Sequence, residues 1–166
     1  MRGKAALILA LAAAACGQPS PEEKARADTR DIAKVEAAQK MRPPVQPIAP
    51  QPILLADIEA HELSGVGCEF ALQAESDPIA VMGEEKGAIK LGGEVAILAA
   101  DTGSAELPSM TYAKYSGRGH AILLTKGPGD GEPIGNESAR WPGSLTIRDP
   151  YDRVVFFAPG FLLCGA

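Results

Sequence analysis

Hydrophobic residues are distributed differently in three parts of the chain. Residues 5–15 form an unbroken run of Ala, Leu and Ile, and residues 17–51 are polar with mostly small apolar residues. From residue 53 onward, apolar and polar residues alternate in short runs, as in half-buried strands. We therefore expect a signal peptide, a tether and one β domain. The boundaries expected from this pattern are 1–15, 16–52 and 53–166.

The C-terminal region contains several runs that fit short antiparallel strands. In GCEFALQ, Cys68, Phe70 and Leu72 fall on one face. In GAIKLGGEVAIL, two apolar runs are separated by Gly92-Gly93, a pair that suits a tight hairpin turn. With the other runs, the pattern predicts seven or eight strands in a small barrel or sandwich. One short helix is expected just before them, in LLADIEAHEL.

The segment that precedes this domain has the composition of a tether. Ser20, Pro21 and Glu23 fit a helix N-cap, a first helical position and a capping box. The helix that follows offers few large apolar residues. The later segment MRPPVQPIAPQP should be extended, because proline fixes its own φ and biases the preceding residue away from helix.

The N-terminus has the layout of a secretory signal. Arg2 and Lys4 precede the apolar run, which is about half of the ~20 residues that a membrane-spanning helix needs. The stretch LALAAAACG resembles the lipobox of bacterial lipoproteins, in which the cysteine after the cleaved bond receives diacylglycerol and further acyl chains such as palmitate. The resemblance implies lipid on Cys16. The family prefers Leu where this chain has Ala13, so the alternative is secretion after cleavage in the alanine run.

Two cysteines remain in the predicted domain. Cys68 and Cys164 form an even pair near its two ends, and such a pair in an exported protein predicts a disulfide. The alternative is a redox or metal role. Neither cysteine lies in a C-x-x-C motif or close to a histidine in the sequence, so the disulfide is favoured.

No segment of the sequence carries a catalytic motif. The chain lacks a G-x-S-x-G elbow, a phosphate-binding loop, a dinucleotide fingerprint and a histidine metal motif. His61 and His120 fit an exposed helix position and a strand position. The acidic loop KGPGDGEPIGNE lacks calcium-loop spacing, RDPYDR fits a hairpin turn, and Trp141 fits a lid on the core better than an exposed recognition residue. We therefore expect a protein that is not an enzyme, with no cofactor and no metal.

Charge is divided unevenly along the chain. From residue 53 onward there are sixteen Asp and Glu against eight Lys and Arg, and before it five against eight. An acidic domain favours basic proteins or cations as partners and disfavours nucleic acid. The alternative is that the negative charge serves only solubility.

The domain also resembles two groups of proteins. Its course from LADIEAHELSGVGCEF to VVFFAPGFLLCGA resembles an uncharacterised group of small proteobacterial lipoproteins. More faintly, it is similar to the membrane-bound lysozyme inhibitors, which have a small barrel, a disulfide from the first strand to the C-terminus, and S-G and K-G motifs. Ser116-Gly117 and Lys126-Gly127 would be those motifs. The resemblance implies that Ser116 and Lys126 contact a lysozyme, although the tyrosine expected after Ser-Gly is missing.

These observations predict a non-catalytic lipoprotein of the cell envelope that binds a partner or supports the envelope. A lysozyme inhibitor is the alternative, and a periplasmic enzyme of unrecognised type is the third possibility. The expected partners are the membrane, through lipid on Cys16, and a basic envelope protein such as a lysozyme. Because Gly17 rather than Asp follows Cys16, the lipoprotein resemblance points to the outer membrane, facing the periplasm.

Overall fold

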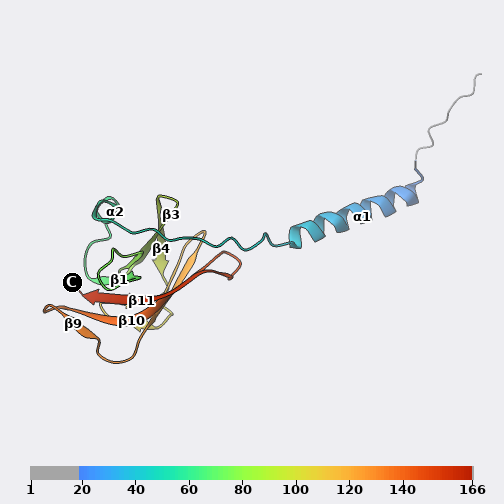
Figure 1. The fold of residues 1–166 in the computed structure, drawn as a ribbon. Helices are drawn as coiled ribbons and strands as arrows, with labels where there is room; N and C mark the ends of the chain where they lie inside the picture. The colour runs from blue at the N-terminus through green and yellow to red at the C-terminus, as the bar shows by residue number, and fades with distance from the viewer. Residues whose placement is uncertain (1–18, 166) are drawn as a thin grey trace, which may run out of the picture. The chain divides into compact units, whose positions relative to one another are not determined.

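The computed structural model describes residues 19–165, which belong to two compact units divided between Pro43 and Pro44. Figure 1 shows the helical first unit and the β-rich second unit. The expected signal peptide and Cys16 lie outside the described residues.

The first unit contains helix α1 (Pro21–Lys40). The capping box expected from the sequence is present at its N-terminus. The Ser20 hydroxyl accepts a hydrogen bond from the Glu23 N–H (3.2 Å), and the Ser20 N–H donates to the Glu23 carboxylate (2.9 Å). Within this unit Ile32 and Val35 are exposed. The helix therefore forms from local capping and propensity rather than from burial of an apolar face.

The second unit is built around a closed antiparallel barrel of eight strands, which confirms the predicted mainly β fold. Each strand pairs with the next barrel strand in the sequence, and the last pairs with the first, so no edge strand is left open. The barrel strands are β1 (Gly67–Ala71), β2 (Ala80–Met82), β3 (Lys86–Leu91), β4 (Glu94–Ala100), β7 (Lys114–Ser116), β8 (Ala121–Lys126), β10 (Ser138–Arg148) and β11 (Val154–Gly165).

Three short strands lie outside the barrel circuit. Strand β9 (Glu132–Ile134) extends the sheet beside the first residues of β10. Strands β5 (Glu106–Leu107) and β6 (Thr111–Tyr112) form a separate ribbon. In that ribbon the Thr111 hydroxyl donates to the Pro108 carbonyl (2.8 Å) and lies 3.2 Å from the Cys68 sulfur, so the ribbon contacts the disulfide.

Side chains fill the interior of the barrel. All eight barrel strands contribute buried residues to one apolar cluster, among them Phe70, Leu98 and Leu145. Tyr115 is fully buried, and its hydroxyl donates to the Gly83 carbonyl (2.7 Å) and accepts from the Tyr112 N–H (3.1 Å). Because its one polar atom has partners on both sides, the ring can occupy the core without an unsatisfied hydroxyl.

Two local sequence patterns have the expected structure, and one differs. Gly92 and Gly93 form the turn between β3 and β4, with φ of 59° and 88°, values that a primed two-residue turn requires. Asp149–Arg153 connects β10 to β11, as expected for RDPYDR. Leu72, however, is 45% exposed rather than on the core face, because β1 ends at Ala71.

Cys68 and Cys164 form the disulfide expected from the sequence. They lie directly opposite each other on β1 and β11, the pair that closes the barrel. They are 96 residues apart, so on the chain-entropy model the bond stabilises the fold by up to about 4–5 kcal/mol, although about 2–4 kcal/mol is typical. The disulfide thus joins the first and last strands of the barrel.

The folded unit begins earlier than the boundary expected at Ile53. The Ile48 N–H donates to the Val155 carbonyl (3.2 Å), and the Gln51 N–H donates to the Lys90 carbonyl (2.8 Å). Ile53 is 1% exposed. The proline-rich segment from Pro44 is therefore bound to the barrel wall, because its free backbone donors reach strands β3 and β11.

Helix α2 (Leu55–Ala60) follows this segment, as predicted, and covers part of the outer barrel wall. Ile58 and Leu63 pack against a small second cluster of Ile53, Val81 and Ala88. The part of the barrel sheet under α2 is therefore apolar on its outer face as well as on its inner face.

Candidate functional site

The two residues singled out for partner binding lie on neighbouring strands, Ser116 at the end of β7 and Lys126 at the end of β8. Ser116 pairs with Ala121, the first residue of β8, and Lys126 is the last residue of that strand. At about 3.3 Å per residue, the two positions are separated by roughly 16 Å along the strand. The structure does not bring Ser116 and Lys126 together.

Lys126 is held by contacts within its own domain. Its ammonium group donates to the carbonyls of Gly127 (3.0 Å) and Gly129 (3.4 Å) and lies 4.9 Å from the centroid of the Trp141 ring. The Trp141 indole N–H donates to the same Gly129 carbonyl (2.9 Å), and Trp141 is 7% exposed. Trp141 is thus the core lid that the sequence favoured, and Lys126 fixes the loop that follows β8.

The other sequence candidates do not form a reactive site. His61 is the C-cap residue of α2, and His120 is half-buried just before β8. In the acidic loop, Glu132 pairs with Arg140 (2.8 Å). Among the described residues, no three His, Cys, Asp or Glu side chains are grouped so that they could hold a metal ion.

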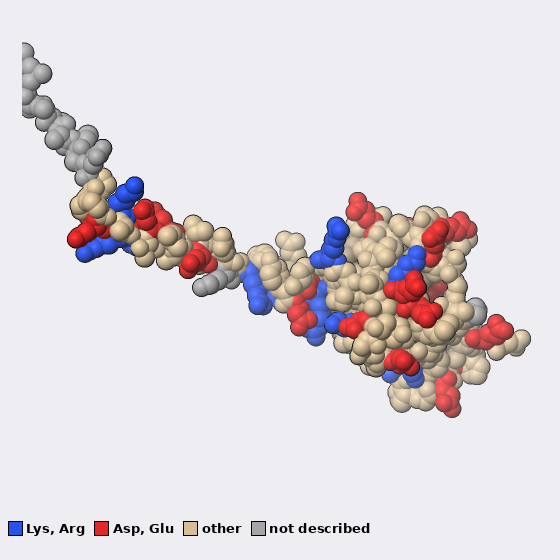
Figure 2. Space-filling model, turned by 180° about the vertical axis from the view of Figure 1, so that it is seen from behind, with Lys and Arg blue, Asp and Glu red and all other residues tan. Residues whose placement is uncertain are grey.

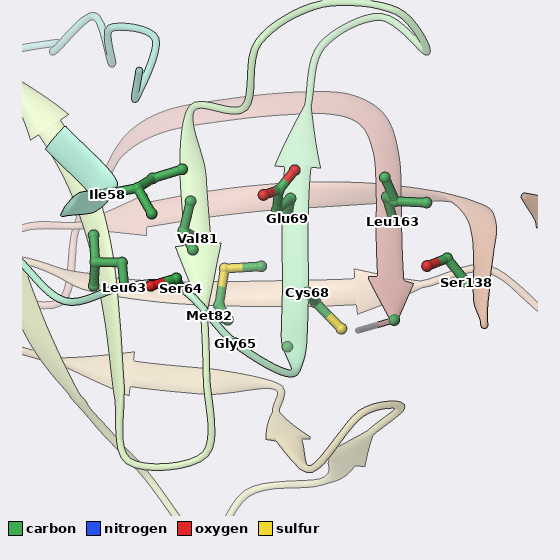
Figure 3. A pocket seen from close by; sticks show the side chains of 12 residues that line it. Ile58, Leu63, Ser64, Gly65, Cys68, Glu69, Val81, Met82, Ser138 and Leu163 are labelled. Atoms are coloured by element: carbon green, nitrogen blue, oxygen red, sulfur yellow. The ribbon is translucent and has the colours of Figure 1, made fainter. Parts of the chain in front are cut away.

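A pocket of about 300 Å³ lies on the outside of the barrel, beside α2. Figure 3 shows the side chains around it: Glu69 stands on β1 between Val81 on β2 and Leu163 on β11, with Ile58 and Leu63 on one side. Gly67 and Gly165, which are paired across β1 and β11, also line it and carry no side chains. Ser64 and Ser138 complete the lining, so the pocket combines apolar side chains with two serines and one acidic group.

Glu69 is a half-buried carboxylate whose two immediate neighbours in its row of the sheet are apolar. The residues directly opposite it are Val81 and Leu163, and the outward residues before and after it on β1 are Gly67 and Ala71. No residue in the described part of the chain forms a hydrogen bond or ion pair with its carboxylate. Burial between apolar groups raises the pKa of Glu69 above its ordinary value.

The wall formed by α2 is fastened to β3 by two lysines. The Lys90 ammonium pairs with the Asp57 carboxylate at 2.8 Å, and both side chains are 18% exposed. Hydrogen bonds from Lys90 and from the Leu54 N–H lower the pKa of Asp57. The Lys86 ammonium donates to the His61 carbonyl (2.8 Å) at the C-terminal end of α2. The side of the pocket that carries Ile58 is therefore held in place by charge-assisted contacts.

A second hollow of about 220 Å³ adjoins the pocket and shares its wall of Leu63–Gly65 and Val81. Glu62, Glu84 and Glu85 line it, together with Lys86. Glu62 adopts a φ of 52°, a left-handed conformation that costs free energy for a residue other than glycine. The two hollows together carry four carboxylates, and none of the four belongs to an ion pair between described residues.

Most Lys and Arg side chains of the second unit already have partners within that unit. Five of its eight Lys and Arg pair with carboxylates, and Lys86 and Lys126 donate to backbone carbonyls. Figure 2 shows acidic side chains spread over the visible face of the barrel unit. The lining of the two hollows carries four carboxylates against the one ammonium group of Lys86, so it has an excess of negative charge.

Sequence reasoning assigned Glu69 only to the solvent face of a strand. The alternation in GCEFALQ correctly placed it opposite Cys68 and Phe70, but its desolvation depends on Leu163 and α2, which are distant in the sequence. No local pattern indicates this environment.

Comparison with family models, curated proteins and solved structures gives no match for this chain. In the described part of the chain, neither helix combines the length and the apolar composition needed to span a membrane.

Proposed function

We propose that this protein is a lipid-anchored, non-catalytic binding module of a bacterial cell envelope. The observation that carries the proposal is the filled barrel interior, to which all eight strands contribute buried side chains. A barrel with a packed interior cannot carry a ligand inside, so recognition falls to its outer surface. That surface has a pocket with a carboxylate that no other described residue pairs with.

The charge of the module supports a basic partner. A surface with an excess of carboxylates attracts cations and raises the association rate of oppositely charged proteins. A basic protein of the envelope fits this surface, whereas a nucleic acid or an anionic lipid surface does not.

The anchor is proposed on Cys16, and helix α1 fits the role of a spacer. Its polar, exposed surface has no apolar face wide enough to form a core of its own. We expect the mature N-terminus to carry a lipid mass on Cys16 and the Cys16→Ser variant to lose membrane attachment or to remain uncleaved. A mature protein without lipid would contradict the anchor and leave the binding role to be tested separately.

The binding role is tested by affinity capture from intact envelopes with the full-length protein, followed by identification of partners by mass. The expected result is enrichment of a basic protein, abolished at high salt. Recovery of no partner under mild cross-linking would contradict the proposal.

A lysozyme inhibitor is a second candidate. The observation that favours it is the small closed barrel with a disulfide between the first and last strands, which is the layout of that family. Ser116, which pairs with the first residue of β8, and Lys126, the last residue of that strand, do not favour a joint role for the two motifs. Unchanged activity of several lysozyme classes in a large excess of the purified protein would exclude this candidate.

A further inference from the structure

We propose that the pocket beside α2 receives a basic side chain of a polypeptide partner, whose aliphatic stem lies against Val81 and Leu163 and whose charge pairs with Glu69. This inference rests on the proposed binding function and names the place and the chemistry of recognition.

The chemistry of the pocket suits a long basic side chain. A lysine or arginine side chain joins several methylene groups to a terminal charge, so it suits a hollow with apolar walls and one acid. The pocket volume of about 300 Å³ leaves room for the stem, and Glu69 supplies the counter-charge. A volume of about 300 Å³ is at the lower end of ligand pockets, which fits one side chain better than a large ligand.

Glu69 has no partner among the described residues of its own chain. A carboxylate between Val81 and Leu163 is partly desolvated, so its pairing with a cation is stronger than that of a fully exposed acid. Arg140 lies in the same row, beyond Leu163, but it pairs with Glu75 (3.2 Å) and Glu132 (2.8 Å). The described residues thus leave the Glu69 position open to an external cation.

The surroundings of the pocket favour a polypeptide over a small amine. The adjoining hollow has three carboxylates against the one ammonium group of Lys86, so its excess of negative charge suits a second positive charge on the same partner. Between the hollows, Ser64–Val66 is exposed, and its backbone groups form no hydrogen bond with other described residues. A peptide backbone can both donate to and accept from such groups, whereas an amine can only donate. A metal ion would need more oxygen ligands than the pocket offers.

The test uses the full-length protein in a neutral detergent and a blocked peptide, acetyl-Gly-Lys-Gly-Lys-Gly-amide. Isothermal titration gives the affinity, and carboxyl ¹³C resonances of labelled glutamates report the site. We expect saturable binding that perturbs the Glu69 carboxyl resonance. The Glu69→Gln variant should weaken the affinity at least tenfold, and its thermal unfolding should show that the fold is kept.

Matched controls separate this site from general charge. Glu94→Gln makes the same charge change on an exposed residue, the first of β4, and should alter the affinity less than twofold. A peptide with norleucine in place of lysine should not bind. Equal losses in the two variants, equal affinity for spermidine, binding of the norleucine peptide, or no saturable binding would each overturn the inference.

A failure of the pocket as the binding site can be told apart from a failure of the binding function itself. If Glu69→Gln captures the same envelope partner as the wild-type protein, with the same affinity, the pocket is not the site while the binding function stands. If the wild-type protein captures nothing, the binding function itself fails.

Discussion

Two regions of the barrel present a charged side chain beside apolar groups, and they differ in whether that charge is already satisfied. Lys126 has two carbonyl acceptors and an aromatic ring in its own loop. Glu69 stands between Val81 and Leu163 with no partner among the described residues. The difference indicates that a charge bound within the fold stabilises it, whereas an unpaired, half-buried charge is available for recognition.

The largest effect is expected at Trp141, the centre of the Lys126 region. Trp141→Ala removes a buried ring and should lower the free energy of unfolding by about 3–5 kcal/mol. Denaturant unfolding followed by far-UV circular dichroism measures the loss. Trp141→Phe is the control, because it keeps much of the apolar volume and loses the indole donor to Gly129. A loss below about 1 kcal/mol in Trp141→Ala would show that the ring does not support the fold.

The next effect concerns the disulfide beside the Glu69 pocket. Replacing both Cys68 and Cys164 with alanine should destabilise the protein by about 2–4 kcal/mol, because the cross-link joins β1 to β11. Hydrogen exchange should increase most in those two strands and least around Lys126. Equal increases in both regions would contradict the local role of the bond, and free thiols in protein purified from the envelope would contradict the bond itself.

A smaller loss is expected at Lys126. Lys126→Met keeps the aliphatic stem and removes the charge, so stability should fall by about 1–2 kcal/mol through loss of the carbonyl and ring contacts. The fluorescence of Trp141, the single tryptophan, should report the change in its surroundings. Affinity for the lysine peptide should not fall. A protein of unchanged stability that loses a lysozyme complex would instead favour a direct binding role for Lys126.

The smallest change in stability is expected at Glu69, where the substitution should stabilise the protein rather than destabilise it. Its pKa is raised in the folded protein, so ionisation costs more there than in the unfolded chain. Ionisation of Glu69 therefore lowers the free energy of unfolding as the pH rises from the ordinary glutamate range through the raised pKa. Glu69→Gln removes this contribution and should be more stable than the wild-type protein at neutral pH by up to about 0.5 kcal/mol. The advantage should vanish in acid, as measured by urea unfolding across pH. A stability loss at neutral pH would contradict this assignment.

The sequence predicted the elements better than their environments. The capping box at Ser20, the Gly92-Gly93 turn and the disulfide follow from neighbouring residues or from a simple cysteine pair, and all three are present. The attachment of Pro44–Ile53 to the barrel was not predicted, because the partners of Ile48 and Gln51 are on strands distant in the sequence.

The candidate site shows the same limit more strongly. A dipeptide motif drew attention to Lys126, and only the fold shows that its charge is bound by Gly127, Gly129 and Trp141. An ordinary strand glutamate gave no signal at Glu69, since its neighbours come from β2, β11 and α2. Whether a charge is satisfied is a property of tertiary contacts, which the local pattern does not encode.

The difference between the unpaired charge of Glu69 and the bound charge of Lys126 is tested most directly by titrating the lysine peptide into two variants of the full-length protein, Glu69→Gln and Lys126→Met. The account predicts that Glu69→Gln weakens binding at least tenfold, while Lys126→Met binds as the wild-type protein does. Wild-type affinity in Glu69→Gln together with lost binding in Lys126→Met would contradict it.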